Sequence, residues 1–273
     1  VFLPKPQVSY QRERWFTPDN DFIDVDFYFH CTTHSAPQKL LILFHGLEGS
    51  SNSFYAQYYD DFFAKQGWTI GIPHFRGCSG EPNWQKRAYF AGDIDEILWI
   101  LQTFSEKYAK TKKYAVGISL GANALLKCAG HYAHLTTNLL NAMVAISTPF
   151  DLTLAGKVLD KGWNRILYTR HFLKTLIPNI EKKCIHYPEI IDQTDLKNIK
   201  TLYDFDDQIT SQLHGFKNAL DYWKKCSSIN DLISIEIPTL LINAQNDPFF
   251  PAYALPQKAQ LSSKITEIGR AHV

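Results

Sequence analysis

The alternation of short apolar runs with amphipathic helical patterns is the feature that most constrains the fold. Five apolar runs bounded by turn residues have the character of strands buried on both faces: 40–44, 68–72, 114–116, 142–146 and 239–243. Helical spacing lies between them, as in Ile94, Ile97 and Leu101 and in the helix-forming run 120–129. Strands that alternate with helices predict an α/β fold with a mostly parallel sheet flanked by helices.

Two segments depart from this alternation. The stretch DFIDVDFYF at 21–29 alternates apolar with polar residues, which is typical of a strand with one buried face, so we expect an antiparallel edge strand there. From about 150 to 235 the sequence offers helices and loops without a convincing buried strand. We therefore expect a helical cap inserted over the sheet, with all 273 residues in one domain.

Within the expected cap, apolar residues fall largely on one helical face: Trp163, Ile166, Leu167, Leu173 and Leu176. We expect this helix to end at Pro178, because proline removes a backbone donor and clashes with the preceding turn. The same region is basic through Lys157, Lys161, Arg165, Arg170, Lys174, Lys182 and Lys183. Peripheral membrane contact or an anionic substrate would explain this charge, and a solvated helix face is the ordinary alternative.

Composition limits the classes of partner. Hydrophobic residues make up 45% of the chain, and no apolar run is long enough to cross a bilayer. Lys and Arg total 28 against 27 Asp and Glu, so the chain lacks the basic field that nucleic-acid binding requires. The five cysteines are scattered without a C-x-x-C pair, which argues against a disulfide framework or a zinc site. We expect a soluble cytoplasmic protein with no nucleic-acid partner.

The motif Gly117-Ile118-Ser119-Leu120-Gly121 is the main candidate for chemistry. It is a G-x-S-x-G that follows an apolar run and precedes a helix-forming run. In a nucleophile elbow the serine lies on a strained strand-to-helix turn, and small flanking residues let the backbone pass. The alternative is a turn whose serine merely caps the following helix.

A turn after the first buried strand is the candidate oxyanion hole. The run 40–44 leads into His45-Gly46-Leu47, where Gly46 allows close backbone approach. The N–H of Leu47 would then be one donor, and the N–H of Leu120, directly after the serine, would be the other. We expect His45 to be satisfied by backbone groups and to shape this turn without reacting.

The acid and the base follow from chain order, since α/β-hydrolases carry Ser, then Asp or Glu, then His. Asp247-Pro248 comes soon after the run 239–243, which places a carboxylate at the carboxyl edge of the sheet. Only His272 lies beyond Asp247, so it is the candidate base by order. The H-x-x-x-H of His30 and His34 lies at a strand end, and we do not expect it to bind a metal.

At this point the chain resembles the YheT-like subfamily of α/β-hydrolases, a group of carboxylesterases and lipase-like acyl hydrolases. The resemblance runs through QRERWFTPDNDFIDVDF, FHGLEGSSNSFYAQ, FRGCSGEPN, RAYFAGD, GISLGANALL, FDDQITSQLHGFKNALDYW and IPTLLINAQNDPFFP. It implies that Ser119 is the nucleophile, that Asp247 is the charge-relay acid, and that the cap shapes an acyl pocket. Residues 76–82 would line the site, although neither Arg76 nor Cys78 receives a chemical role.

The resemblance fails at the carboxyl terminus. Members of the family carry the histidine in a GGHVGF-like turn a little further along, whereas this chain reads GRAHV and stops. EIGRAHV is also the translation of GAG ATC GGA AGA GCA CAC GTC, which contains a common sequencing-adapter sequence. We hypothesise adapter read-through from near Ile268, a non-native tail of about 268–273, and a fragment truncated at both ends. The family's final strand, histidine and last helix would then be absent.

Together these features predict a serine hydrolase that cleaves carboxylic esters through an acyl-enzyme intermediate. Ser119 attacks, a histidine (tentatively His272) accepts its proton, and Asp247 orients the imidazole. We expect no metal and no organic cofactor, and a small-molecule or lipid ester as substrate. A non-catalytic binding protein on the same fold is the main alternative, and thioesterase or lipase specificity is another.

Overall fold

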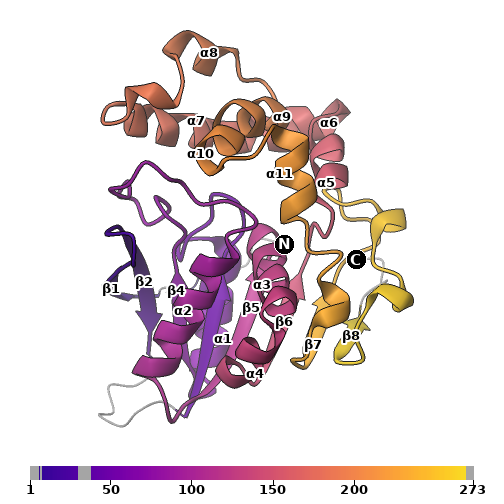
Figure 1. Cartoon of the computed structure of the whole chain (residues 1–273). Coiled ribbons are helices and arrows are strands. Elements are labelled where there is room, and N and C mark those ends of the chain that lie inside the picture. Colours follow the sequence, from indigo (N-terminus) through magenta and orange to yellow (C-terminus); the bar gives the residue numbers. More distant parts are fainter. Residues whose placement is uncertain (1–5, 7, 30–37, 269–273) are drawn as a thin grey trace.

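One sheet organises the described part of the chain, which in this computed structural model comprises residue 6, residues 8–29 and residues 38–268. Its strand order is β1-β2-β4-β3-β5-β6-β7-β8 (Figure 1). The strands are β1 Gln11–Phe16, β2 Phe22–Tyr28, β3 Lys39–Phe44, β4 Thr69–Pro73, β5 Lys112–Ile118, β6 Ala142–Ile146, β7 Thr239–Ile242 and β8 Ile265–Ile268. Only the pairs β1–β2 and β2–β4 are antiparallel. The mostly parallel sheet predicted from the sequence is confirmed.

All five predicted buried runs form strands, but two of them are less buried than predicted. Every residue of β4 is buried, whereas alternate residues of β6 and β7 are only half-buried, among them Val144 and Leu240. Val144 packs with the residues of helix α1 (Phe54–Ala64), which covers mainly the β3–β4–β5 side of that face. Within the described residues this face is thinly covered beyond β5, and this explains the difference.

The antiparallel strand predicted at 21–29 is confirmed as β2, but the prediction that it lies at the edge was wrong. Strand β2 lies between β1 and β4, and its polar residues are as buried as its apolar ones, with Asp24 and Asp26 each 2% exposed. Arg14 of β1 forms an ion pair with Asp24 at 2.8 Å, and Arg12 forms one with Asp26 at 2.7 Å. The paired carboxylates can therefore be buried where the alternation suggested solvent.

Helices α2 (Ile94–Lys107) and α3 (Leu120–His131) pack on the other face of the sheet, with α4 (Ala133–Leu139) beside them. Both α2 and α3 confirm the helical patterns read from the sequence. Their buried side chains meet the inward-facing residues of β3, β5 and β6 in the largest hydrophobic cluster. Full burial of one large apolar side chain contributes about 1.5–3 kcal/mol to the free energy of folding. Because this face buries the most such side chains among the described residues, it forms the main core.

The insertion between β6 and β7 is helical, as predicted, and lies over one edge of the sheet (Figure 1). We call residues 150–235 the cap. Its helices are α5 Leu152–Leu159, α6 Gly162–Asn164, a π-helical turn Arg165–Thr169, α7 Arg170–Cys184, α8 Gln193–Asn198, α9 Leu202–Phe205, a second π-helical turn Asp206–Thr210, α10 Ser211–His214 and α11 Ala219–Cys226. Short 3₁₀ helices are Pro188–Ile190 and Leu232–Ser234 in the cap, then Ala252–Ala254 and Lys258–Gln260 after β7.

Two details of the cap differ from prediction. Helix α7 continues through Pro178, because Leu176 and Ile180 on either side of it are buried in the cap's own core and hold the helix together. The expected single apolar face is divided: Leu173 and Leu176 are buried, whereas Trp163, Ile166 and Leu167 are exposed. The wider π-helical turn at Arg165–Thr169 shifts the helical phase between the two groups.

Candidate active site

Ser119 lies in a sharp turn between β5 and α3. Its φ is +53° and its ψ −118°, a conformation that residues other than glycine rarely adopt. A Cβ atom on Gly117 would lie 2.5 Å from Cα of Ala122, and one on Gly121 would lie 2.4 Å from the carbonyl oxygen of His45. Both flanking positions therefore require glycine. The Ser119 side chain makes no capping bond to a described residue, which argues against the helix-cap alternative.

The turn after β3 lies directly beside the serine. A Cβ atom on Gly46 would be 3.3 Å from Cβ of Ser119. Leu47 and Leu120 line the same cavity as Ser119, and neither backbone N–H donates a hydrogen bond to any acceptor in the described chain. The structure thus brings together three of the predicted site residues, Ser119, Leu47 and Leu120, at one cavity.

His45 is a structural residue, as expected. Its Nε2 accepts a hydrogen bond of 3.1 Å from the N–H of Phe75, so Nδ1 carries the proton and donates to the carbonyl oxygen of Gly46 at 2.8 Å. Complete burial lowers the pKa of His45 to about 3, which keeps the ring neutral. With both nitrogens engaged, His45 cannot act as the base.

Asp247 follows β7 at the same edge of the sheet. Ile118 at the end of β5 pairs with Ile146, which pairs in turn with Ile242 at the end of β7. Because these strands are parallel, the turns after β5 and β7 leave the sheet at one edge. The predicted acid and the predicted nucleophile therefore lie on the same side of the molecule.

The Asp247 carboxylate faces its own turn. Its Oδ1 accepts a hydrogen bond of 2.8 Å from the N–H of Phe249, and partial burial raises the pKa of Asp247 above its usual range. Phe249 and Phe250 line the cavity with Ser119, although Asp247 itself does not. No hydrogen bond or ion pair joins Asp247 to a described histidine. His74 bonds to the carbonyl oxygen of Asp24, and His214 lines the cavity and packs on Phe90, with its Nε2 unpaired among the described residues. His131, His134, His171 and His186 are exposed.

His272 lies outside the described residues, as do His30, His34 and most of the expected non-native tail. The last described residue, Ile268, ends β8 and pairs with Ile242. The expectation that the final strand is absent was therefore wrong, because Ile265–Ile268 extend the sheet as a parallel strand beside β7. The adapter hypothesis for the remaining tail stays a hypothesis.

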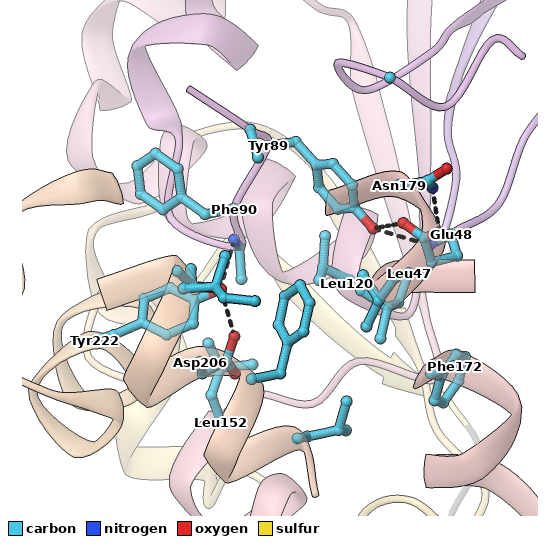
Figure 2. A pocket seen from close by; sticks show the side chains of 18 of the residues that line it. Leu47, Glu48, Tyr89, Phe90, Leu120, Leu152, Phe172, Asn179, Asp206 and Tyr222 are labelled. Atoms are coloured by element: carbon cyan, nitrogen blue, oxygen red, sulfur yellow. Dashed lines mark hydrogen bonds between the residues drawn. The ribbon is translucent and has the colours of Figure 1, made fainter. Parts of the chain in front are cut away.

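A cavity of about 220 Å³ opens onto Ser119 between the sheet edge and the cap. Leu47 and Leu120 line it together with the cap residues Leu152 and Phe172, all four labelled in Figure 2. Most of its other walls are apolar, including Ala155, Leu159, Leu176, Phe205, Ile209, Leu213 and Phe250. Such walls suit an acyl chain.

The segment 76–82 contributes Arg76, Gly77, Gly80 and Pro82 to this cavity, in agreement with the resemblance. Arg76 is 4% exposed and pairs with Asp21 at 2.8 Å and with Glu96 at 2.5 Å, so its charge is used to hold the segment in place. Burial raises the pKa of Cys78 well above its usual value, which makes it a thiol and a poor nucleophile.

Sequence reasoning missed a polar cluster on the cavity wall, formed by Glu48, Tyr89 and Asn179 (Figure 2). The only signal was that Glu48 and Tyr89 lie in the segments that carry the family resemblance. It also treated Lys183 as part of a basic surface, whereas Lys183 is 7% exposed and donates to the carbonyl oxygens of Gln85 and Arg87.

The described residues also show the state of the cysteines, the length of the helices and the grouping of possible metal ligands. The described cysteines, Cys78, Cys128, Cys184 and Cys226, are free. The helices found in residues 8–29 and 38–268 are all too short or too polar to span a bilayer. The same residues hold no cluster of His, Cys, Asp and Glu side chains suited to a metal ion.

Comparison with known sequences agrees with the geometry. A family model described as the alpha/beta hydrolase fold matches residues 39–272. A protein of Escherichia coli (strain K12) named "Putative esterase YheT" is 36% identical over 256 residues, which cover 93% of this chain and 74% of that protein. Human "Phospholipase ABHD3" is 24% identical over 92% of this chain and 62% of its own length. The "Monoacylglycerol lipase" of Saccharomyces cerevisiae is 25% identical over 87% of this chain and 52% of its own length.

Solved structures show the same fold. A fungal esterase from Rhizomucor miehei superposes with a TM-score of 0.59 at 15% identity, covering 98% of this chain and 75% of that one. Est1E from Butyrivibrio proteoclasticus, solved with ferulic acid, superposes with a TM-score of 0.57 at 12% identity over 96% and 89% of the two chains. The chain spans about three quarters of the E. coli relative and less than two thirds of the human and yeast ones. The chain belongs to the α/β-hydrolase fold family, in its YheT-like group of esterase- and lipase-type members.

Proposed function

We propose that the protein is a serine hydrolase that cleaves carboxylic esters through an acyl-enzyme intermediate. The observation that carries this is Ser119, held at φ +53° beside the unengaged N–H groups of Leu47 and Leu120 and facing an apolar cavity. Such a constellation presents a nucleophile and two oxyanion donors to one carbonyl group.

In the first half-reaction Ser119 Oγ attacks the ester carbonyl carbon while a histidine takes its proton. The Leu47 and Leu120 N–H groups stabilise the negative oxygen of the tetrahedral intermediate. The intermediate expels the alcohol, which receives the proton from the imidazolium, and the acyl group stays on Oγ. In the second half-reaction water, deprotonated by the same histidine, releases the acid and restores Ser119.

Asp247 would orient the histidine and stabilise its charged form. Its turn position and raised pKa suit a carboxylate whose cationic partner is not among the described residues. By chain order that partner is His272. If the carboxyl-terminal residues are adapter-derived, the base is instead a histidine of the natural gene that this chain lacks.

The cavity favours esters with an apolar acyl group, from small molecules to lipids. The names of two relatives, a phospholipase and a monoacylglycerol lipase, support a lipid ester. Thioesterase and lipase specificity would use the same residues, so a series of p-nitrophenyl, acylglycerol and acyl-thioester substrates is needed to separate them. No metal or organic cofactor enters these steps.

The cap also suggests contact with an anionic lipid surface. Trp163 is 76% exposed, Leu167 58% and Ile166 46%, at helical spacing in the cap. Five exposed residues from the same stretch of the cap are basic and form no ion pair with any described residue: Lys157, Lys161, Arg165, Arg170 and Lys174. We call these eight residues the cap patch. Apolar and basic side chains together are suited to anionic lipid headgroups.

We also propose a cytoplasmic location, supported by the free thiols of the four cysteines that the structure describes. Reaction of the native protein with a thiol reagent before and after reduction would test it. Equal labelling is expected, and an increase after reduction would point to an oxidising compartment.

Turnover of a short-chain p-nitrophenyl ester tests the proposed function. It should be measured for this chain and for any carboxyl-terminally extended form recovered from the genome, each with Ser119 and with Ser119→Ala. Turnover that needs Ser119 supports the proposal, and activity only in the extended form shows that His272 is not the base. A folded extended protein with neither turnover nor reaction with a fluorophosphonate would favour the binding-protein alternative.

A further inference from the structure

The residue that follows the oxyanion donor has an unusual environment. Glu48 has a φ of +55°, which is rare outside glycine and asparagine, and its side chain lies in the cavity wall. Its Oε1 accepts a hydrogen bond of 2.7 Å from the Tyr89 hydroxyl, and its Oε2 accepts one of 2.9 Å from Asn179 Nδ2 (Figure 2). The backbone N–H of Glu48 donates to the same Tyr89 hydroxyl at 3.1 Å.

These three side chains come from three separate parts of the fold. Glu48 belongs to the turn after β3, Tyr89 to the connection between β4 and α2, and Asn179 to cap helix α7. Tyr89 closes a ring of hydrogen bonds with the side chain and the backbone of Glu48. Asn179 then joins this ring to the cap.

The peptide unit that carries the Leu47 N–H is fixed on its other side as well. The carbonyl oxygen of Gly46 accepts hydrogen bonds from His45 Nδ1 at 2.8 Å and from the N–H of Gly49 at 2.9 Å. Because a trans peptide is planar, its N–H points away from its carbonyl. The hydrogen bonds to the Gly46 oxygen therefore fix the direction of the Leu47 N–H. That direction is kept only while the following residue, Glu48, keeps its left-handed backbone conformation.

We propose that Glu48 is a positioning residue for the oxyanion hole, and that Asn179 makes this positioning depend on the docked cap. The inference rests on the proposed ester hydrolysis and adds to it a link between cap and oxyanion donor. Glu48 touches neither the nucleophile nor the reacting carbonyl in this account. It acts through Tyr89 and its own backbone, which preserve the φ of +55° that the turn requires.

The chemistry of the cluster supports positioning over simple packing. Burial raises the pKa of Glu48, and hydrogen bonds from Tyr89, from Thr175 of α7 and from Asn179 of α7 oppose that rise. An apolar side chain would fill the same space without the cost of burying a carboxyl group. An apolar side chain could not accept a hydrogen bond from Asn179 of the cap. Nor could it accept one from the Tyr89 hydroxyl, which also binds the backbone N–H of residue 48.

The test separates positioning from stability through kcat and KM in a form of the protein that shows Ser119-dependent turnover. Glu48→Ala should lower kcat about 100-fold and Asn179→Leu about 10-fold, both with little change in KM, because an oxyanion donor acts mainly in the transition state. Rates of fluorophosphonate labelling of Ser119 should fall in parallel.

Two further variants make the test specific. Glu48→Gln places an amide donor opposite Asn179, and adding Asn179→Asp supplies an acceptor, so the double variant should recover most of the kcat lost by Glu48→Gln alone. Thr169→Val is the matched control: Thr169 is fully buried in the cap, bonds to the carbonyl of Leu159 at 2.8 Å and does not line the cavity. It should lower the melting temperature and leave kcat unchanged.

Wild-type kcat in Glu48→Ala or Asn179→Leu would overturn the inference and leave the proposed function standing. A loss of kcat in Thr169→Val as large as in Asn179→Leu would also overturn it, since any loosening of the cap would then suffice. If the wild-type protein shows no Ser119-dependent turnover or labelling in any form, the proposed function fails, and this inference fails with it.

Discussion

The backbone N–H of Ser119 donates a hydrogen bond of 2.9 Å to the carbonyl oxygen of Ile146. The pairing of β5 with β6 thus continues one residue past the end of β5, up to the residue whose φ is +53°. From there the carbonyl oxygen of Ser119 accepts the N–H of Asn123 in the first turn of α3. The strained turn is therefore held by the sheet on one side and by the helix on the other.

Because the turn at Ser119 is held on both sides, it cannot move to make room for a methyl group at Gly121. Gly121→Ala would push its Cβ to within 2.4 Å of the His45 carbonyl oxygen, a rigid backbone atom. We expect a loss of about 3 kcal/mol in the free energy of unfolding, measured by urea denaturation. Gly162→Ala is the control, because nothing lies within 4 Å there and only its φ of +52° is unfavourable, a cost of about 1 kcal/mol. Equal losses would contradict the packing explanation.

Asp247 should matter for turnover and little for folding. In the form of the protein with Ser119-dependent activity, Asp247→Asn should lower kcat by about 10³- to 10⁴-fold, because the histidine loses its orienting charge. Its half-buried side chain bonds only within its own turn, so the melting temperature should change little. Asp231→Asn, which alters a distant ion pair with Lys127, should keep wild-type kcat. An Asp247→Asn enzyme with normal turnover would exclude Asp247 as the acid.

The buried ion cluster around Arg76 should dominate the stability of segment 76–82. Arg76→Met leaves Asp21 and Glu96 buried without their cation, so we expect a loss of about 3–5 kcal/mol in the free energy of unfolding. Arg165→Met, at an exposed position, should change it by no more than about 0.5 kcal/mol. A small effect of Arg76→Met would show that the carboxyl groups take up protons when the arginine is removed.

Asp206 should make stability depend on pH. Its carboxyl accepts hydrogen bonds from Thr210 Oγ1 and Trp223 Nε1, and burial raises its pKa to about 7. Between the ordinary carboxyl pKa of about 4 and this value, the folded state holds a proton that the unfolded state has lost. The stabilisation is therefore complete below pH 4 and is lost as pH rises through about 7.

Asp206→Asn should remove this contribution. We expect the difference in unfolding free energy between pH 5 and pH 8 to shrink by about 2 kcal/mol relative to wild type. Asp151→Asn is the control, because Asp151 lies in the same cap but bonds to the first turn of α5 and not to the Asp206 site. An unchanged difference in Asp206→Asn would mean that Asp206 is already ionised at pH 5.

The cap patch should bind anionic membranes. Sedimentation with phosphatidylcholine vesicles containing phosphatidylserine should pull down the wild-type protein, more strongly at low salt, and the Trp163→Ser/Leu167→Ser variant should stay in solution. Leu135→Ser on α4, where the side chain is 49% exposed, should bind like wild type. Equal binding by all variants, or loss of a dimer in the cap variant instead, would contradict membrane contact.

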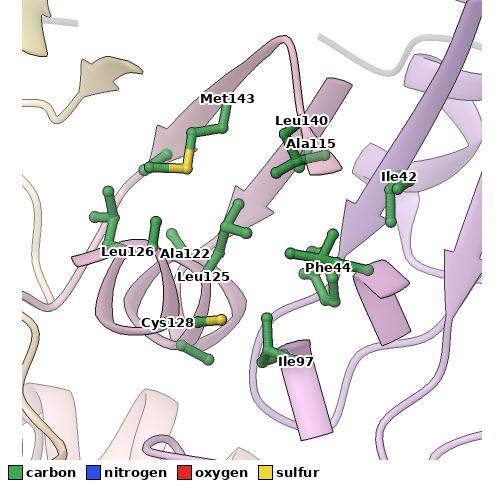
Figure 3. Packing of buried hydrophobic residues seen from close by; sticks show 14 of the residues in the cluster. Ile42, Phe44, Ile97, Ala115, Ala122, Leu125, Leu126, Cys128, Leu140 and Met143 are labelled. Atoms are coloured by element: carbon green, nitrogen blue, oxygen red, sulfur yellow. The ribbon is translucent and has the colours of Figure 1, made fainter. Parts of the chain in front are cut away.

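The central strands and the elbow were predictable because their patterns are local. Apolar runs become β3 to β7 because one face of the parallel sheet is covered throughout and the other is covered from β3 to β5. The helical spacing of α2 and α3 matches the face they bury. Figure 3 shows the result: Leu125 and Leu126 lie on the side of α3 that faces Ala115 of β5 and Met143 of β6. The elbow was predictable for a similar reason. Gly117 and Gly121 flank Ser119 in the sequence, and a Cβ atom at either position would clash with neighbouring backbone.

What the sequence could not predict depends on contacts between distant residues. Strand β1 reads as a polar stretch, and only its pairing with Asp24 and Asp26 shows that Arg12 and Arg14 belong to a strand. The hydrogen bond that links the oxyanion turn to the cap joins Glu48 to Asn179, which lies 131 residues further along the chain. No local period links such positions, so the fold must be known before either can be given a role.

The most direct test of the central claim is mass spectrometry of the protein after reaction with a fluorophosphonate. It should be run on this chain and on any carboxyl-terminally extended form recovered from the genome, with intact-mass measurement and peptide mapping of the adduct. We predict one adduct per chain, on Ser119, in a form that turns over esters, and none in Ser119→Ala. An adduct on another residue, or equal labelling of the Ser119→Ala protein, would contradict the assignment of Ser119 as the nucleophile.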